Sequence, residues 1–152
     1  MSSPTPRPAA RIVDHPIHTM LAQIPFTCFV GTLITDIVYA MNADMQWSNF
    51  SDWLLTIGLL VSVLVVIFGL IDFARGRRVR SALGATWIHG LGDAVALLVA
   101  IVNAFVHTRD AYTSVVPEGL LLSLVTVLIL LAVGWSDRSK ARPRGALQEE
   151  RI

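Results

Sequence analysis

Apolar residues gather in four long segments of the chain. These run from about Ile17 to Met41, from Trp53 to Phe73, from Leu83 to His107 and from Gly119 to Trp135. A helix that crosses about 30 Å of hydrocarbon needs roughly 20 residues, so the segments have about the length of membrane spans. Because lipid offers no partners for backbone polar groups, only helices and closed barrels can span it. The segments lack the alternation typical of strands, and the pattern therefore predicts four transmembrane helices.

The links between the four segments are short. They cover residues 42–52, 74–82 and 108–118, and Pro117 in the last link suits the start of a helix. Short links make neighbouring helices antiparallel. We therefore predict an all-α membrane protein, a four-transmembrane-helix antiparallel up-down bundle, whose membrane domain covers residues 14–137.

The composition agrees with a surface that faces lipid. Hydrophobic residues make up 54% of the chain and charged residues only 15%, against roughly 25% charged in a typical soluble protein. The tails at residues 1–13 and 138–152 are polar and rich in proline or charge, and we expect both to be disordered. Cys28 is the only cysteine, which excludes an intrachain disulfide and a cysteine-rich zinc site.

Basic residues predict the orientation in the membrane. Eleven of the twelve Lys and Arg residues lie in the two tails or in the link between the second and third segments, and only Arg109 lies elsewhere. Because cytoplasmic loops are rich in Lys and Arg, we expect both termini on the cytoplasmic side, N-in and C-in. The same rule accounts for the arginines without a nucleic-acid partner. Aromatic residues would then mark the outer interface at Tyr39, Trp47, Trp53 and Tyr112, and the inner interface at Trp135.

The third segment carries a polar stripe along one helix face. An ionisable side chain at mid-bilayer costs roughly 2.5–3.5 kcal/mol, so each one requires an explanation. Residues spaced by three or four fall within about 40° of one line on a helix. That line is polar at both ends and small in the middle, and it contains, in order, His89, Asp93, Ala96, Ala100, Asn103 and His107.

The other segments carry related stripes. The first has His18, Pro25, Thr32 and Asp36 on one face. The second adds a face with small or polar side chains, formed by Gly58, Ser62, Gly69 and Asp72. The fourth offers only Gly119, Ser123 and Thr126, and we interpret it as a packing helix.

Helix direction sorts the polar residues into two clusters. The inner, cytoplasmic cluster contains His15, His18, Asp72, His89 and Asp93, and the outer one contains Asp36, Asn103 and His107. Two histidines at similar depth with carboxylates nearby favour a functional site, so His18 and His89 are the main candidates. We interpret Asp36 as a polar group that pairs helices, and His107 as a residue that reaches interfacial water.

The first segment resembles a bacterial membrane family catalogued as domain of unknown function 2231. The resemblance is carried by His15-Pro16-Ile17-His18-Thr19-Met20-Leu21, with Pro25-Phe26 and Asp36 behind it, and by Gly69-Leu70-Ile71-Asp72 and His89. It covers about Asp14 to Trp135. Two positions depart from the family pattern, because Thr19 stands where a second proline is usual and Asp93 where asparagine is more frequent.

The resemblance implies a context rather than an activity. It implies a multi-pass protein of the bacterial inner membrane, and it points to membrane or periplasmic redox proteins as partners, since relatives accompany Rieske, cytochrome and periplasmic dehydrogenase modules. Electron transfer is therefore an expectation by analogy. A homo-oligomer is compatible with the sequence. No nucleophile constellation, phosphate loop or dinucleotide fingerprint is visible, so we do not expect an enzyme by itself.

Three functions fit the polar residues best. A transporter or proton-relay role is the remaining alternative, although no span has the inverted repeat or broken helix that would favour transport. A haem b subunit would use His18 and His89 as axial ligands, with Asp93 and Asp72 nearby, and a slot at Gly69, Gly92 and Ala96. A non-haem metal site for iron, zinc or copper would use His15, His18, Asp72, His89 and Asp93. A non-catalytic anchor or assembly subunit would use buried polar groups only to specify helix pairing.

Overall fold

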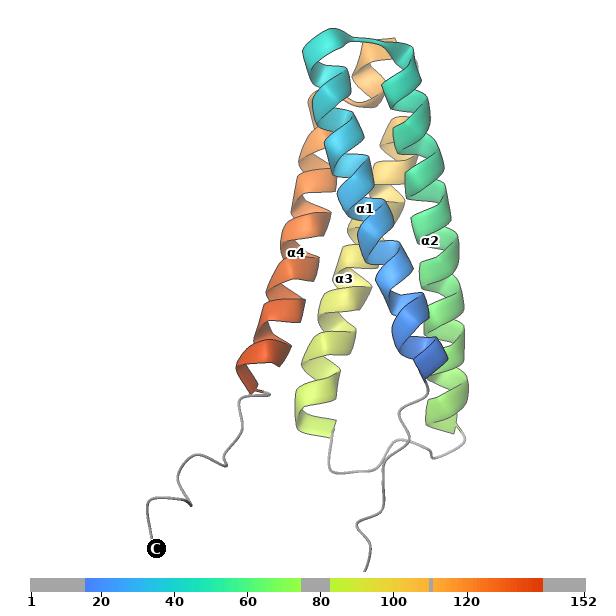
Figure 1. Ribbon diagram of the computed structural model, residues 1–152, viewed down its shortest axis with the longest axis vertical. Coiled ribbons are helices and arrows are strands. Elements are labelled where there is room, and N and C mark those ends of the chain that lie inside the picture. The colour runs from blue at the N-terminus through green and yellow to red at the C-terminus, as the bar shows by residue number, and fades with distance from the viewer. Residues whose placement is uncertain (1–15, 75–82, 110, 141–152) are drawn as a thin grey trace, which may run out of the picture.

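The computed structural model describes residues 16–74, 83–109 and 111–140. Within these ranges the chain forms four α-helices and one short 3-10 helix, with no strand, and Figure 1 shows the helices side by side in an elongated bundle. They are α1 (Pro16–Asn42), α2 (Met45–Ala74), α3 (Leu83–His107), η2 (Ala111–Ser114) and α4 (Glu118–Lys140). All four α-helices contain a stretch long and apolar enough to cross a membrane, which confirms the predicted fold class.

The bundle has two different ends. The turn between α1 and α2 and the helix η2 lie at one end, which we name the turn end, and α1 and α3 both begin at the opposite end, the tail end (Figure 1). Successive helices therefore run in opposite directions, as short links require. The cytoplasmic location of the tail end stays a prediction from the basic residues.

The start of α2 differs from the sequence prediction. We predicted a link over residues 42–52, but α2 begins at Met45. Asp44 caps this helix, because its side-chain Oδ1 accepts a hydrogen bond from the N–H of Gln46 at 3.0 Å and its carbonyl accepts one from Trp47 at 3.0 Å. A capped first turn satisfies backbone donors that would otherwise lack partners. The polar residues after Asp44 therefore form helix rather than loop.

The α1–α2 turn is very tight. The N–H of Ala43 donates to the carbonyl of Tyr39 at 2.7 Å, and the N–H of Asp44 donates to Asn42 Oδ1 at 3.0 Å. Ala43 has a φ of 53°, which lies in the left-handed region that glycine occupies at many helix ends. The turn thus closes α1 and opens α2 within two residues.

One residue from each helix forms the apolar core. Phe29 of α1, Leu55 of α2, Ala100 of α3 and Val127 of α4 are all buried and belong to one cluster, which we name the core layer. The helix α1 packs mainly on α2 and α4, and α3 packs mainly on α4, whereas α2 and α3 have the least extensive contact of the neighbouring pairs. Helices α1 and α3 therefore occupy diagonal corners of the bundle.

Glycines allow two close helix approaches. A Cβ added at Gly58 would lie 2.9 Å from Cε1 of Phe29 and 3.1 Å from Cβ of Cys28, so α1 and α2 pack closely there. A Cβ at Gly92 would overlap the side chain of Val133 on α4. Gly92 therefore faces α4, and its expected place in an open slot for a cofactor is wrong. Small residues at such positions are the ordinary means of close packing in lipid.

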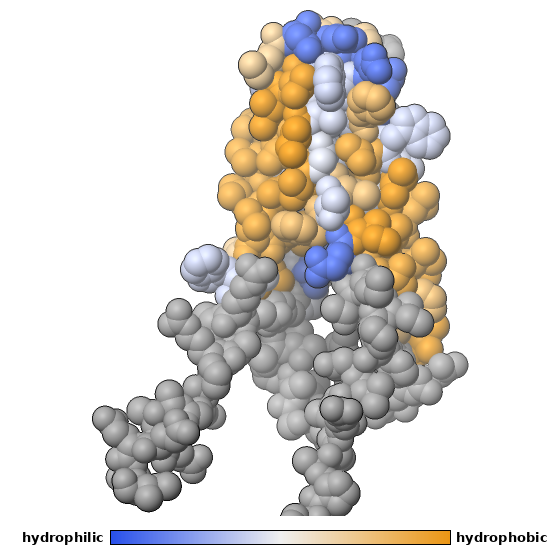
Figure 2. All heavy atoms as spheres, in the orientation of Figure 1, coloured by the Kyte–Doolittle hydropathy of each residue, from blue (hydrophilic) through white to orange (hydrophobic). Residues whose placement is uncertain are grey.

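The sides of the bundle are apolar. Figure 2 shows hydrophobic residues on both sides of a paler stripe along the visible face, with hydrophilic residues at the turn end and at the other end of the stripe. Large side chains such as Leu60, Leu98 and Phe105 are 63%, 63% and 71% exposed. Water-soluble monomers rarely expose continuous apolar surface of this extent. The surface is therefore one that hydrocarbon chains would cover.

Candidate functional site

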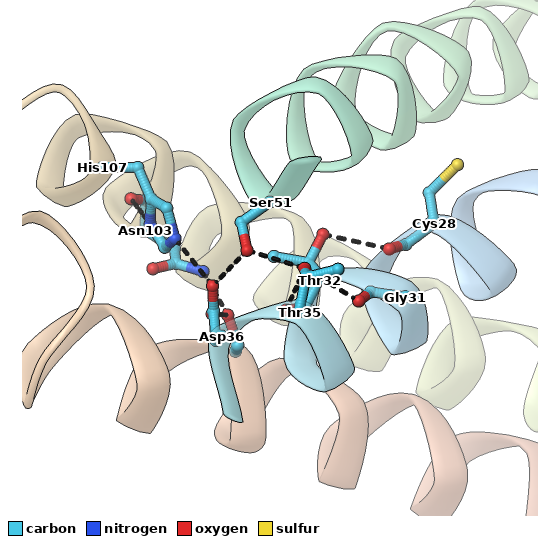
Figure 3. A network of polar contacts seen from close by, with 9 residues as sticks. Cys28, Gly31, Thr32, Thr35, Asp36, Ser51, Asn103 and His107 are labelled. Atoms are coloured by element: carbon cyan, nitrogen blue, oxygen red, sulfur yellow. Dashed lines mark hydrogen bonds and ion pairs between the residues drawn. The ribbon is translucent and has the colours of Figure 1, made fainter. Parts of the chain in front are cut away.

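A buried carboxylate near the turn end links all four helices. Asp36 of α1 is fully buried. Ser51 of α2 donates to Asp36 Oδ1 at 2.5 Å, and Ser123 of α4 donates to Asp36 Oδ2 at 2.6 Å. His107 of α3 lies with Nε2 at 3.1 Å from Oδ1, as Figure 3 shows. One side chain thus receives polar contacts from every other helix of the bundle.

A second ring of contacts surrounds this carboxylate. Asn103 Nδ2 donates to Ser123 Oγ at 2.8 Å, and Thr35 Oγ1 lies 2.7 Å from Ser51 Oγ. Nδ1 of His107 lies 3.1 Å from the carbonyl oxygen of Asn103. All of these side chains are buried. We name the whole group the Asp36 hub, which consists of Thr35, Asp36, Ser51, Asn103, His107 and Ser123.

Helical spacing explains how the sequence assembles the hub. Asn103 and His107 are four residues apart and therefore share one face of α3. On α1, the hydroxyl of Thr32 donates to the carbonyl of Cys28 at 3.0 Å, and the hydroxyl of Thr35 lies 3.0 Å from the carbonyl of Gly31 (Figure 3). Such local bonds satisfy hydroxyls in lipid without water. The α1 stripe predicted at Pro25, Thr32 and Asp36 is buried, as expected.

Gly119 makes room for the imidazole of His107. A Cβ added at Gly119 would lie 2.8 Å from Cε1 of His107 and 2.9 Å from the carbonyl oxygen of Ser114. Real Cβ atoms do not approach other atoms so closely. The first turn of α4 and the segment before it therefore cover the end of α3, and glycine is the residue that permits this.

The structure bears on four interpretations from the sequence. His107 is not an interfacial residue, because it is only 6% exposed and lies beneath the start of α4. Tyr39 is 1% exposed and its hydroxyl donates to Met45 Sδ at 3.5 Å, so its side chain faces the bundle, and its place at the outer interface stays a prediction. Helix α4 does more than pack, because Ser123 contributes to the hub. The interpretation of Asp36 as a helix-pairing group is confirmed by its contacts.

The α3 stripe has two different halves. Ala96, Ala100, Asn103 and His107 are buried and face the bundle interior, as the spacing predicted. Asp93 is exposed and lines two cavities instead. The opposite face of the helix carries the exposed residues Leu98 and Ile101.

Asp93 is the only residue of the inner cluster whose side chain the structure describes. His15 lies before the first described residue. His18, Asp72 and His89 belong to α1, α2 and α3, but their side chains are outside the described part of the structure. The predicted site at these residues stays a prediction. The side chain of Tyr112, predicted at the outer interface, is also outside the described part of the structure. Trp53 and Trp135 are 69% and 75% exposed.

Two adjoining cavities occupy the tail-end side of the core layer. The larger has a volume of about 690 Å³ and lies between α2 and α3, with Gly69, Gly90 and Asp93 in its wall. The smaller, of about 160 Å³, reaches α1 and α4 and is lined by Pro25, Ser62 and Asp93 among others. Both cavities share Val65, Val66, Asp93 and Leu97 in their walls. We name the two cavities together the Asp93 hollow, because Asp93 is the one carboxylate among the residues that line them.

The described side chains offer no ready metal site. Among the side chains that the structure describes, which do not include those of His18, Asp72 and His89, no group of three His, Cys, Asp or Glu is arranged to hold a metal ion. The Asp36 hub supplies one imidazole and one carboxylate, whose facing atoms bond to each other. The imidazole and the carboxylate of the hub are therefore already engaged with each other in a hydrogen bond.

Four apolar helices, a lipid-compatible surface and a buried polar hub define a multi-pass membrane protein. The chain belongs to the family described as "Predicted membrane protein (DUF2231)", whose model matches residues 14–141. This confirms the resemblance that the His15–Leu21 segment indicated. No curated protein and no solved structure matches the chain. The family description names no activity.

Proposed function

We propose that this protein is a bacterial inner-membrane subunit that holds a b-type haem and serves a membrane or periplasmic redox partner. The axial ligands would be His18 and His89. The observation that carries the proposal is the hollow at the tail-end side of the core layer, lined by the same helix faces on which these histidines occur. When bound, haem supplies one-electron transfer.

The hollow has the character that a flat apolar ring needs. Its wall is apolar apart from Asp93 and Ser62, and it contains the small residues Gly69, Gly90 and Ala94. Helix bundles hold cofactors between facing helices at such places. Gly92 faces Val133 and is not part of the hollow, so Gly69 and Ala96 remain from the predicted slot residues.

Helix register supports the two ligands. His89 precedes Asp93 by four residues, and His18 precedes Pro25 by seven, and both of these later residues line the hollow. Residues at these spacings share a helix face. Because α1 and α3 occupy diagonal corners, ligands on them would approach a ring from opposite sides. Asp93 would accept a hydrogen bond from the second ring nitrogen of His89 and fix its orientation.

An absorption spectrum tests this proposal. The full chain would be expressed with a haem supply, purified in lipid nanodiscs and recorded reduced minus oxidised. We expect the Soret and α bands of a b-type haem, lost in His18→Ala and His89→Ala and kept in the matched control His15→Ala. A pure, folded protein without a Soret band would overturn the proposal. Elemental analysis of the same samples would then identify a non-haem metal held by His15, His18, Asp72, His89 and Asp93.

A second candidate function is a membrane anchor or assembly subunit. It is favoured by the Asp36 hub, in which buried polar groups from all four helices bond to one another and so specify the bundle. This function predicts that His18→Ala and His89→Ala leave a folded protein that still co-purifies with its partner. A loss of partner binding in both variants, with the fold kept, would contradict it.

A further inference from the structure

Both ring nitrogens of His107 face hydrogen-bond acceptors. Nδ1 lies 3.1 Å from the backbone carbonyl of Asn103, which can only accept. Nε2 lies 3.1 Å from Oδ1 of Asp36. A neutral imidazole carries one N–H, so it can satisfy only one of these two contacts as a donor. The protonation of the pair is therefore constrained by geometry.

We propose that Asp36 and His107 form a proton-binding site that holds one proton between Nε2 of the imidazole and Oδ1 of the carboxylate. Because the Asn103 carbonyl requires a hydrogen on Nδ1, the second proton has two possible locations. It is carried either by Nε2, opposite an ionised Asp36, or by Asp36, opposite a bare Nε2. In both arrangements the pair holds one proton in this contact and has no net charge.

The hydroxyls around Asp36 favour the arrangement with the proton on His107. Asn103 donates to the Ser123 hydroxyl, which leaves that hydroxyl free to donate its own hydrogen to Asp36. The Ser123 and Ser51 contacts of 2.6 and 2.5 Å have the length typical of a hydroxyl that donates to an ionised carboxylate. In a medium of low dielectric, a pair with no net charge costs less than one that has gained or lost a proton, and this holds for both arrangements.

Few other charges surround this pair in the described chain. Asp52 of α2 interacts electrostatically with both Asp36 and His107. Helix α4 contributes the neutral hydroxyl of Ser123, and the Glu118 carboxylate at its start pairs with the exposed Arg109. Asn103 adds an unusual feature, since its Oδ1 is buried without a hydrogen-bond partner among the described residues. This amide oxygen could accept a hydrogen bond from a water molecule that brings a proton to the site.

Access to the site is one-sided. His107 is the last residue of α3, and the exposed residues Thr108 and Arg109 follow it, so the site lies near the surface of the turn end. On the other side, the core layer separates the hub from the Asp93 hollow, with Ala100 three residues before Asn103. An apolar layer does not conduct protons. The site therefore exchanges its proton at the turn end and does not carry protons through the bundle.

Nitrogen NMR of the histidine rings tests the proton count. The full chain would be labelled with ring-¹⁵N histidine in lipid nanodiscs, and His107→Gln would identify the His107 signals. We expect a protonated Nδ1, together with an Nε2 signal that reports the shared proton. Asp36→Asn should keep the Nδ1 proton and change the Nε2 signal. A bare Nδ1 of His107 in the unmodified protein would overturn the proposal.

A flux measurement tests the one-sided access. Vesicles that contain the full chain and a trapped pH-sensitive dye would be given a pH gradient, with empty vesicles as the reference. We expect no flux that depends on His107, so the unmodified protein and His107→Gln should behave alike. A flux lost in His107→Gln would overturn one-sided access. Neither experiment depends on haem at His18 and His89, so the two proposals fail separately.

Discussion

His107 and Asp36 are 71 residues apart in sequence, yet Nε2 of one lies 3.1 Å from Oδ1 of the other. Neither side chain has more than 2% of its surface exposed. The contact joins the end of α3 to the second half of α1, and Ser51 and Ser123 extend it to α2 and α4. The hub is thus the polar counterpart of the core layer, because each includes residues from every helix.

Removal of the central carboxylate should strongly destabilise the bundle. Asp36→Ala leaves the donors of Ser51, Ser123 and His107 buried without their acceptor, and breaking a buried charged pair costs about 3–5 kcal/mol. Thermal unfolding in detergent, followed by circular dichroism, measures the loss. Ile37→Ala is the matched control, because Ile37 is the next residue and is 44% exposed. Equal melting temperatures for the two variants would contradict the central role of Asp36.

Gly119 should not tolerate a methyl group. Gly119→Ala brings a Cβ to 2.8 Å from the His107 ring and 2.9 Å from a backbone oxygen, and overpacking of this kind costs about 1–3 kcal/mol. Gly134 on the same helix provides the control, since nothing lies within 4 Å of a Cβ added there. We expect Gly134→Ala to be neutral or stabilising in the same melting experiment. If Gly119→Ala melted no lower than Gly134→Ala, the close approach to His107 would be in error.

The α1–α2 turn offers a stabilising substitution. Ala43 has a φ of 53°, and a left-handed conformation costs a residue with a Cβ about 1–2 kcal/mol. Ala43→Gly should therefore raise the melting temperature. Ala40→Gly, inside α1, should lower it, because glycine in a helix interior costs about 1 kcal/mol. Two shifts of the same sign would argue against the left-handed turn.

The contact between Gly92 and Val133 can be tested by a double-mutant cycle. Gly92→Ala should destabilise the protein, because its Cβ would overlap the Val133 side chain. Val133→Ala removes the overlapping methyl groups, so the double variant should be more stable than the sum of the two single effects predicts. Unfolding free energies of the four proteins provide the measurement. Additive effects would show that α3 and α4 do not pack closely at this position.

The sequence predicts the helices and their inward faces because both depend on local patterns. The third segment, residues 83–107, coincides with α3, and the buried stripe from Ala96 to His107 follows from helical spacing. The start of α2 was missed because a single capping residue, Asp44, makes a polar stretch helical. Length and hydropathy carry no information about such a cap.

The hub could be predicted only in part. Ionisable residues inside a span are conspicuous, so Asp36 and His107 could be selected as candidates. Hydroxyls are common in membrane helices, and whether Ser51 and Ser123 reach Asp36 depends on helix rotation and depth, which the sequence does not specify. The burial of His107 depends on the chain after α3 folding over it, with Gly119 at the contact.

The order in which the hub residues are synthesised has a consequence for membrane insertion. Ser123 follows Asp36 by 87 residues and belongs to the last helix, so the carboxylate gains its final donor only after α4 has entered the bilayer. Until then Asp36 and His107 are costly groups within an incomplete bundle. A chain truncated before α4 would therefore carry an unsatisfied acid in lipid. This unsatisfied carboxyl group would chemically distinguish incomplete chains from complete ones.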